Sequence, residues 1–217
     1  MKIPAIQIRR AQADDAAFLA QVMLSASRGH LPKGIWDLRI GAGECACLDY
    51  LRRLALAEPH SLCHYSAFFI ASVGDRPASA LCGFDPRGGA WSLVAEAMAN
   101  VQRDLNWSQA ELDASDQRLA PIWQCFLPDA GADWGIEFVA TLPEYRRRGL
   151  AGLLLDQVLH EGAARGSKLA QLVTFIGNDA AISVYLRAGF RIADEKRCDA
   201  LLAALNAPGF VRLTRTL

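Results

Sequence analysis

One short segment constrains the fold more than any other part of this 217-residue chain. The apolar run WGIEFVAT (Trp134 to Thr141) predicts a strand, and it leads through a short loop into RRRGLAG, Arg146 to Gly152. A leucine-rich helix is expected from about Gly149 to Arg165. LAQLVTFI, residues 169–176, is a nearly continuous apolar run, typical of a strand buried on both faces. The order is therefore strand, glycine loop, helix and buried strand.

The segment Arg146 to Gly152 predicts an anion site. Arginines at the start of a helix lie against the positive end of its dipole, which costs a few tenths to about 1 kcal/mol. The segment has no Ser, Thr, Asp or Asn to cap the first amides, and Gly149, Ala151 and Gly152 leave that backbone open. A bound phosphate or pyrophosphate would compensate for both features. The alternative is a solvated arginine cluster in which the glycines only tighten a turn.

Spacing argues against two other phosphate-binding motifs, and a nucleic-acid-binding surface centred on Arg146 to Arg148 stays a third, less favoured interpretation. A Walker A loop would end in Gly-Lys-Ser/Thr, and a dinucleotide fingerprint needs G-x-G-x-x-G with an acidic residue about 20 positions later. A nucleic-acid surface centred on Arg146 to Arg148 would spread further and include interleaved aromatic residues. Lys plus Arg and Asp plus Glu both number 23, so the composition gives no sign of a nucleic-acid or membrane partner.

The rest of the chain predicts further helices and strands. Residues 85–121 interrupt the pattern with one or two polar-faced helices, which we interpret as an insertion. The other expected elements are a strand at Ile6 to Ile8, a helix capped by Asp14, a helix from about Cys45 to Ala57, a hairpin of residues 66–73 and 78–84, a helix capped by Asn178, and a strand from Phe210 to Thr216.

The composition indicates one domain over residues 1–217. Hydrophobic residues make up 52% of the chain, and this length suits one well-packed core better than two. No signal-peptide h-region and no run of about 20 apolar residues is present, so we expect a cytoplasmic protein. The six cysteines lack repeated CxxC spacing and are expected to be reduced and metal-free. The alternative is a metal site built from Cys45, Cys47, His60, Cys63 and His64.

Two motifs of the C-terminal half resemble the GNAT N-acetyltransferase superfamily. Arg146-Arg-Arg-Gly149-Leu-Ala151 is similar to the family's Q/R-x-x-G-x-G/A pyrophosphate loop. Asn178-x-x-Ala181-x-x-x-Tyr185-x-x-x-Gly189-Phe190 is similar to its later Asn-to-Gly-Phe helix, one helix and one strand further on. The resemblance implies an α/β fold: a central mixed β-sheet flanked by helices, here with the helical insertion 85–121 between the third and fourth strands.

The resemblance also implies that acetyl-CoA lies where the strand ending at Thr141 and the strand 169–176 splay apart. Backbone groups around Val139 and Thr141 would pair with the pantetheine arm, and the Val139 amide region would polarise the thioester carbonyl. Asn178 would contact the same arm. The pyrophosphate would be held by the loop residues Arg146, Arg147, Arg148, Gly149, Ala151 and Gly152.

Tyr185 and Glu137 are the candidate catalytic residues. The resemblance gives Tyr185 the position of the general acid that protonates the departing thiolate in many family members; the alternative is a packed core tyrosine. Strand alternation predicts that Glu137 shares a face with Val139 and Thr141, so its carboxylate could serve as a general base, directly or through a water. The alternative is an edge carboxylate paired with an arginine.

These features predict an acetyl-CoA-dependent N-acetyltransferase that transfers acetyl directly to a primary amine, without an acyl-enzyme. A non-catalytic acyl-CoA-binding sensor or regulatory domain is the alternative. The sequence does not identify the amine acceptor, which is a small molecule or a peptide. Three tryptophans, Trp36, Trp91 and Trp107, could line the acceptor pocket; the alternative is that they anchor the core. The insertion is expected to pack over the acceptor side. A homodimer formed through the C-terminal strands is possible for this fold, but the sequence does not decide the oligomeric state.

Overall fold

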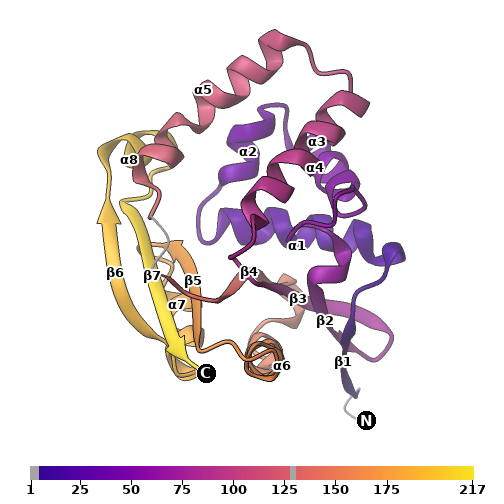
Figure 1. Ribbon diagram of the computed structural model, residues 1–217, viewed down its shortest axis with the longest axis vertical. Coiled ribbons are helices and arrows are strands. Elements are labelled where there is room, and N and C mark those ends of the chain that lie inside the picture. Colours follow the sequence, from indigo (N-terminus) through magenta and orange to yellow (C-terminus); the bar gives the residue numbers. More distant parts are fainter. Residues whose placement is uncertain (1–4, 128–130) are drawn as a thin grey trace.

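The computed structural model describes residues 5–127 and 131–217, and within them seven strands form one mixed β-sheet (Figure 1). The strands are β1 (Ile6–Arg10), β2 (Phe68–Val73), β3 (Arg76–Phe84), β4 (Trp134–Thr141), β5 (Leu169–Phe175), β6 (Arg191–Arg197) and β7 (Gly209–Thr216). Their order across the sheet is β1-β2-β3-β4-β5-β7-β6. Only β4 and β5 are parallel neighbours. The predicted mixed sheet is thereby confirmed.

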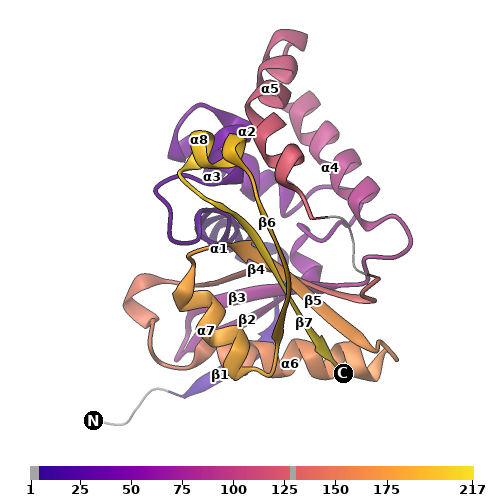
Figure 2. The same cartoon turned by 90° about the vertical axis from the view of Figure 1, so that its left-hand side faces the viewer.

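Helices cover both faces of this sheet (Figure 2). The helices are α1 (Ala16–Arg28), α2 (Ile35–Ile40), α3 (Glu44–Leu54), α4 (Ala90–Asp104), α5 (Gln109–Cys125), α6 (Leu150–Ala164), α7 (Asp179–Arg187) and α8 (Asp199–Leu205). Buried side chains of α6 pack on one face, with α7 beside them, and those of α1, α3 and α4 pack on the other. α5 and α8 share a third apolar cluster with β5 and β7.

The packing of α6 against the sheet depends on two glycines. A Cβ atom at Gly162 would lie 2.8 Å from the Trp134 ring, and one at Gly83 would lie 2.2 Å from a methyl group of Val158. Trp134, Val158 and their neighbour Leu154 are almost wholly buried. The close approach of helix and strands therefore requires both glycines and fixes α6 relative to β4.

The insertion contributes two long helices, α4 and α5, which lie beyond the sheet (Figure 2). α4 and α5 fill most of the predicted segment 85–121, but α5 continues to Cys125 because Pro121 is accommodated inside it. Ser108 begins α5 with a capping box in which its hydroxyl accepts from the Glu111 amide. The insertion follows β3 and precedes β4, as the sequence predicted.

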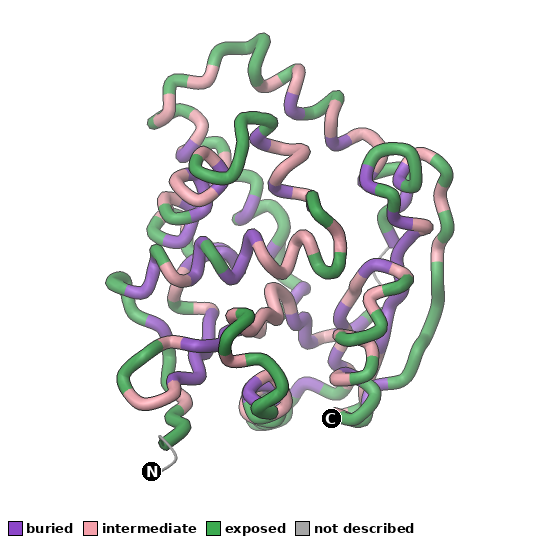
Figure 3. The backbone as a smooth tube through the Cα atoms, turned by 180° about the vertical axis from the view of Figure 1, so that it is seen from behind, coloured by how far each residue is buried: buried purple, intermediate pink, exposed green. Residues whose placement is uncertain are grey.

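Three elements and one cap differ from the sequence-based expectation. α2, β6 and α8 were not predicted; α2 and α8 are short, and β6 is an exposed, charged edge strand without apolar alternation (Figure 3). Asp14 does not cap α1; instead the Asp15 carboxylate accepts from the Gln12 amide at 2.8 Å and binds Arg9. Helix α1 therefore begins one short 3-10 turn later than expected. Among the described helices, none is long and apolar enough to cross a membrane.

Candidate functional site

The sheet opens between its two parallel strands. β4 and β5 pair only through Trp134 with Ala170 and Gly135 with Gln171. Past these pairs, β4 stays with β3 as far as Thr141, and β5 stays with β7 as far as Phe175. The carboxyl ends of β4 and β5 therefore diverge, and such ends are where ligands bind in open α/β sheets. The predicted splaying of these strands is observed.

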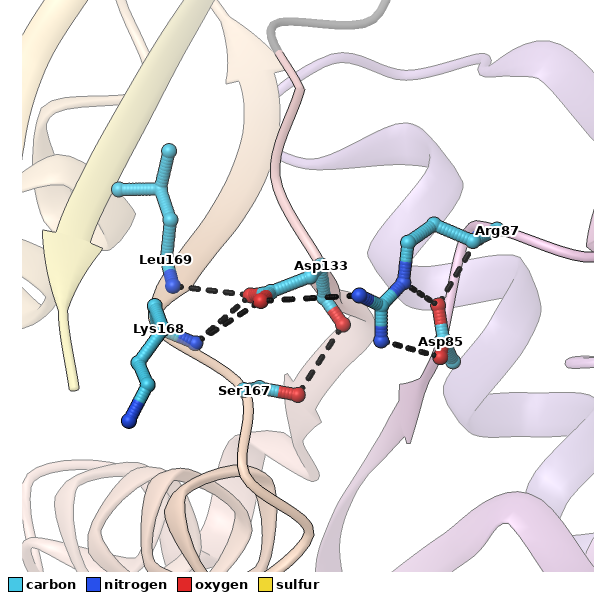
Figure 4. Close-up of polar contacts among 6 residues, drawn as sticks. All are labelled: Asp85, Arg87, Asp133, Ser167, Lys168 and Leu169. Atoms are coloured by element: carbon cyan, nitrogen blue, oxygen red, sulfur yellow. Dashed lines mark hydrogen bonds and ion pairs between the residues drawn. The ribbon is translucent and has the colours of Figure 1, made fainter.

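Asp133 holds the two strands together where they begin (Figure 4). Its carboxylate accepts from the Lys168 amide at 2.9 and 3.0 Å and from the Leu169 amide at 2.9 Å. Its carbonyl accepts from the Ser167 hydroxyl at 3.2 Å, and Arg87 lies 3.9 Å from the carboxylate. The Leu169 amide is the main reason why the pKa of Asp133 is lowered. The strands are thus fixed at one end and separate at the other.

The loop before α6 presents an uncapped helix start. Gly149 occupies the N-cap position with φ 77°, and no side chain caps the helix. Arg147 is also left-handed, with φ 62°, a conformation that costs a non-glycine residue about 1 kcal/mol or more. A Cβ atom at Gly149 or Gly152 would meet nothing within 4 Å. The backbone around the first turn of α6 is therefore open on the side that both glycines face.

The three arginines of this loop are exposed, and none forms an ion pair with any described residue. Arg146 donates to the Thr141 carbonyl at 3.2 Å, and Arg148 donates to the Glu144 carbonyl at 3.4 Å. Unpaired guanidinium groups beside uncapped amides are the two components of a phosphate site. The loop residues thus fit the pyrophosphate of a CoA ester, the group that the sequence predicted here.

Glu137 lies on a different face of β4 from the one expected. Ala80 pairs with Ala140 and Cys82 pairs with Glu137, so Leu81 alone stands opposite two residues, Phe138 and Val139. This β-bulge, with Phe138 at φ 56°, breaks the alternation of the strand. Val139 packs with the cluster around α6, whereas Glu137 shares the face of its partner Cys82, which α1, α3 and α4 cover. The predicted common face of Glu137, Val139 and Thr141 is therefore wrong.

The Glu137 side chain is partly buried, and its carboxylate has no polar partner among the described residues. It makes no hydrogen bond or ion pair with any described residue, so the alternative of an arginine-paired edge carboxylate does not hold. Burial raises the pKa of Glu137 to about 7, because a low-dielectric surrounding disfavours the charged form. A carboxyl group that titrates near neutrality can accept a proton at physiological pH. Glu137 is thus chemically suited to general base catalysis.

Tyr185 of α7 lies within electrostatic reach of Glu137, although 48 positions separate them along the chain. Its side chain is buried, and its ring makes an edge contact with Phe190 at 6.4 Å. Burial, and next the charge of Glu137, raise the pKa of Tyr185 above its ordinary value. The phenol therefore keeps its proton at neutral pH and can act only as a donor. Tyr185 packs with the cluster on the α6 side of the sheet, whereas Glu137 shares the other face with Cys82, so the two predicted catalytic residues lie within electrostatic range of each other but on different faces of the sheet.

Asn178 and the tryptophans differ in part from expectation. Asn178 occupies the N-cap position of α7 but makes no capping bond; its amide donates instead to the Thr174 hydroxyl at 2.9 Å. Trp36 is buried and Trp107 is partly buried in the core beside α3, so both anchor the core. Trp91 is exposed. Among the described residues, no group of three or more His, Cys, Asp or Glu side chains could hold a metal, and all six cysteines are unpaired thiols.

The bulge at Phe138 and the Asp133 contacts were missed by the sequence analysis. The bulge depends on the register with β3, which no local pattern shows. An aspartate directly before a predicted strand was the only signal for Asp133, because its partners lie 35 and 36 positions away.

Comparisons with known proteins agree with this geometry. The model of the acetyltransferase (GNAT) family matches residues 48–190. The fold is similar to that of an N-acetyltransferase from Staphylococcus aureus Mu50, with 18% identity, a TM-score of 0.65, and 96% of this chain and 100% of that chain covered. A Drosophila melanogaster polyamine N-acetyltransferase that forms N-acetylagmatine has 14% identity and a TM-score of 0.55, with 98% and 100% covered.

A Bacillus subtilis acetyltransferase in complex with CoA has 15% identity and a TM-score of 0.51, with 100% and 99% of the two chains covered. At these identities the solved structures show the fold alone. No curated protein matches the chain. The family match spans more than half of the chain, from α3 through the open strands to the end of the Tyr185 helix. The chain therefore belongs to the acetyltransferase (GNAT) family and is an acyltransferase.

Proposed function

We propose that residues 1–217 form one catalytic domain that transfers an acetyl group from acetyl-CoA directly to the nitrogen of a primary amine. The observation that carries this proposal is the separation of β4 and β5 beside the open, arginine-rich start of α6, with Glu137 on β4 and Tyr185 on α7 within electrostatic range of each other. One group has a pKa suited to accepting a proton near neutrality, and the other keeps its proton. Pairs of groups whose pKa values are pushed apart are typical of acid and base catalysis.

The open loop supports acetyl-CoA as the cosubstrate. The first amides of α6 and the side chains of Arg146, Arg147 and Arg148 would hold the pyrophosphate, with Gly149, Ala151 and Gly152 leaving room for it. Val139 and Thr141, on the diverging part of β4, would bind the pantetheine arm through their backbone, and Asn178 would lie beside it. Bound there, the thioester supplies an acetyl group with a good leaving group. The CoA complex of the Bacillus subtilis structure supports the same assignment.

Glu137 and Tyr185 would move the two protons of the transfer. The amine nitrogen forms a bond to the acetyl carbon, and the carbon–sulfur bond breaks. Glu137 takes the proton that the amine loses, directly or through a water, and Tyr185 gives its proton to the departing sulfur. The Val139 amide region stabilises the negative charge that develops on the carbonyl oxygen. No cysteine nucleophile is required in this direct transfer.

Turnover with a panel of primary amines tests the proposal. Free thiol released from acetyl-CoA would be followed with small amines, amino acids and short peptides, and the acetylated product would be identified by mass spectrometry. Wild type should turn over at least one amine, and Glu137→Gln should reduce that rate with little change in acetyl-CoA affinity. Tight acetyl-CoA binding without product from any amine would instead favour a sensor or regulatory domain.

We further propose that the protein is cytoplasmic. A homodimer formed through the exposed edge strand β6 stays a prediction.

A further inference from the structure

Two cysteine thiols meet where the insertion ends. Cys125 is the last residue of α5, and Cys198 lies between β6 and α8, 73 positions further along the chain. Helix α5 ends beside α8 (Figure 1). The thiol of Cys125 is within hydrogen-bonding reach of Cys198, and Cys198 packs against the apolar cluster to which Cys125 belongs. The fold thus brings together two sulfur atoms from distant segments.

Backbone contacts hold this pair of thiols in place. Cys125 Sγ lies 3.5 Å from the Lys196 carbonyl oxygen, and the Lys196 ammonium group donates to the Phe126 carbonyl at 3.2 Å. The Cys198 amide donates to the Pro208 carbonyl at 3.0 Å. The end of α5 and the end of β6 are therefore bonded to each other on both sides of Cys125, and the backbone of Cys198 is fixed as well.

The two thiols differ in exposure. Cys125 is fully buried, whereas Cys198 is partly exposed. Burial, and next the contact with Cys198, raise the pKa of Cys125 to about 11, so this thiol keeps its proton at neutral pH. A small oxidant therefore reaches Cys198 first, with Cys125 directly behind it. An accessible thiol with a second thiol beside it is the arrangement found in redox-sensing cysteine pairs.

The other four cysteines lack this combination. Cys47, Cys63 and Cys82 are buried, and burial raises the pKa of each above its usual value, which makes a thiol inert. Cys45 is exposed, but Cys47 is only two positions away on α3, and side chains at that spacing do not face each other. Oxidation within one molecule is therefore expected at Cys125 and Cys198.

We propose that Cys125 and Cys198 form a reversible disulfide when the protein meets hydrogen peroxide. The Cys198 thiolate attacks one peroxide oxygen and the O–O bond breaks, which gives the Cys198 sulfenic acid and a hydroxide that takes up the proton lost by the thiol. The Cys125 sulfur then attacks the Cys198 sulfur, the S–O bond breaks, and the oxygen leaves as water with the Cys125 proton. The two sulfur atoms lose two electrons, which the peroxide gains. A dithiol reductant reverses the reaction by exchange.

The disulfide fastens the exit of the insertion to the C-terminal part of the sheet. The chain leads from Cys125 to β4, whereas Cys198 follows β6. A cross-link between residues so far apart in the sequence stabilises the fold mainly by restricting the unfolded chain. This modification site is independent of the proposed function, since neither cysteine takes part in acetyl transfer.

The test treats the full chain with hydrogen peroxide and then maps its disulfides. We expect the number of free thiols in the denatured protein to fall by two, and mass spectrometry without reduction to find the peptides of Cys125 and Cys198 joined. Dithiothreitol should restore both thiols. The melting temperature of the oxidised protein should rise by about 5 °C or more. Cys198→Ser should abolish the cross-link and the temperature shift, whereas Cys45→Ser, at the exposed cysteine of α3, is the matched control and should keep both.

Three results would overturn the proposal. Oxidation of Cys198 to a sulfinic acid while Cys125 stays free would mean that the two sulfur atoms do not reach each other. A dimer linked through Cys45 as the only disulfide product would place the reactive thiol elsewhere. An unchanged thiol count, at a peroxide concentration that oxidises glutathione in the same sample, would mean that the pair is inert.

Discussion

Replacing Glu137 by glutamine should stabilise the protein at neutral pH while it impairs catalysis. Glu137 is partly buried and its carboxylate has no described hydrogen-bond or ion-pair partner, so burial raises its pKa from an ordinary 4.5 to about 7. Above that pH the folded protein must hold a partly buried negative charge that no described residue compensates. Glutamine has nearly the same shape and cannot ionise. The variant therefore removes the charge and keeps the volume.

The size of the effect follows from proton linkage. Between pH 4.5 and about 7 the folded state holds a proton on Glu137 that the unfolded state has released. The free energy of unfolding of wild type thus falls as pH rises through this window, by about 1.4 kcal/mol per pH unit and about 3 kcal/mol in total. The contribution is fully present below pH 4.5 and is lost above 7. Glutamine has no such dependence.

Urea denaturation at several pH values between 4.5 and 8 measures this difference. The free energy of unfolding of Glu137→Gln minus that of wild type should increase by about 3 kcal/mol from pH 4.5 to 8. Glu96→Gln, a change at an exposed glutamate of α4, is the matched control and should give a flat difference. A flat difference for Glu137→Gln as well would refute the partly buried, proton-accepting carboxylate. In parallel, the rise of kcat/KM around pH 7 should disappear in the variant.

Three further predictions concern the site and its support. Tyr185→Phe keeps the packing against Phe190 but removes the proton donor, so steady-state kinetics should show a larger loss in turnover than in acetyl-CoA affinity; equal turnover would mean another acid. Asp133→Asn should speed hydrogen exchange at the Lys168 amide and weaken acetyl-CoA binding, and unchanged exchange there would contradict its structural role. Gly162→Ala should lower thermal stability by about 1 to 3 kcal/mol, because its methyl group meets the rigid Trp134 ring; a stability gain would contradict that packing.

The sequence predicted those parts of the fold that local patterns encode. β4 has the bounds expected from its apolar run, and the uncapped start of α6 follows from the absence of a capping residue before Gly149. Tyr185 was recognised from spacing within one helix. Each of these signals lies within a few residues of the feature it predicts.

The rest depends on contacts between distant segments. The bulge at Phe138 arises from the register of β4 with β3, and it changes the face on which Glu137 lies. Strand β6 has charged residues on both sides because it is an edge, so no period-2 pattern was visible. The rings of Phe84, Trp91 and Phe126 come from β3, α4 and the end of α5, and only the fold brings them into contact. Contacts of this kind, between segments far apart in the chain, cannot be predicted from any short window of the sequence.

Calorimetric titration with acetyl-CoA, on wild type and Gly152→Leu, tests the central claim most directly. A Cβ atom at Gly152 would meet no protein atom within 4 Å, so the variant should fold normally, and its side chain should occupy the space proposed for the pyrophosphate. Ala163→Leu, at an exposed position of the same helix, is the matched control. We expect micromolar binding in wild type and the control, and loss of binding in Gly152→Leu. Equal binding by all three proteins, or no binding by wild type, would contradict the proposed acetyl-CoA site.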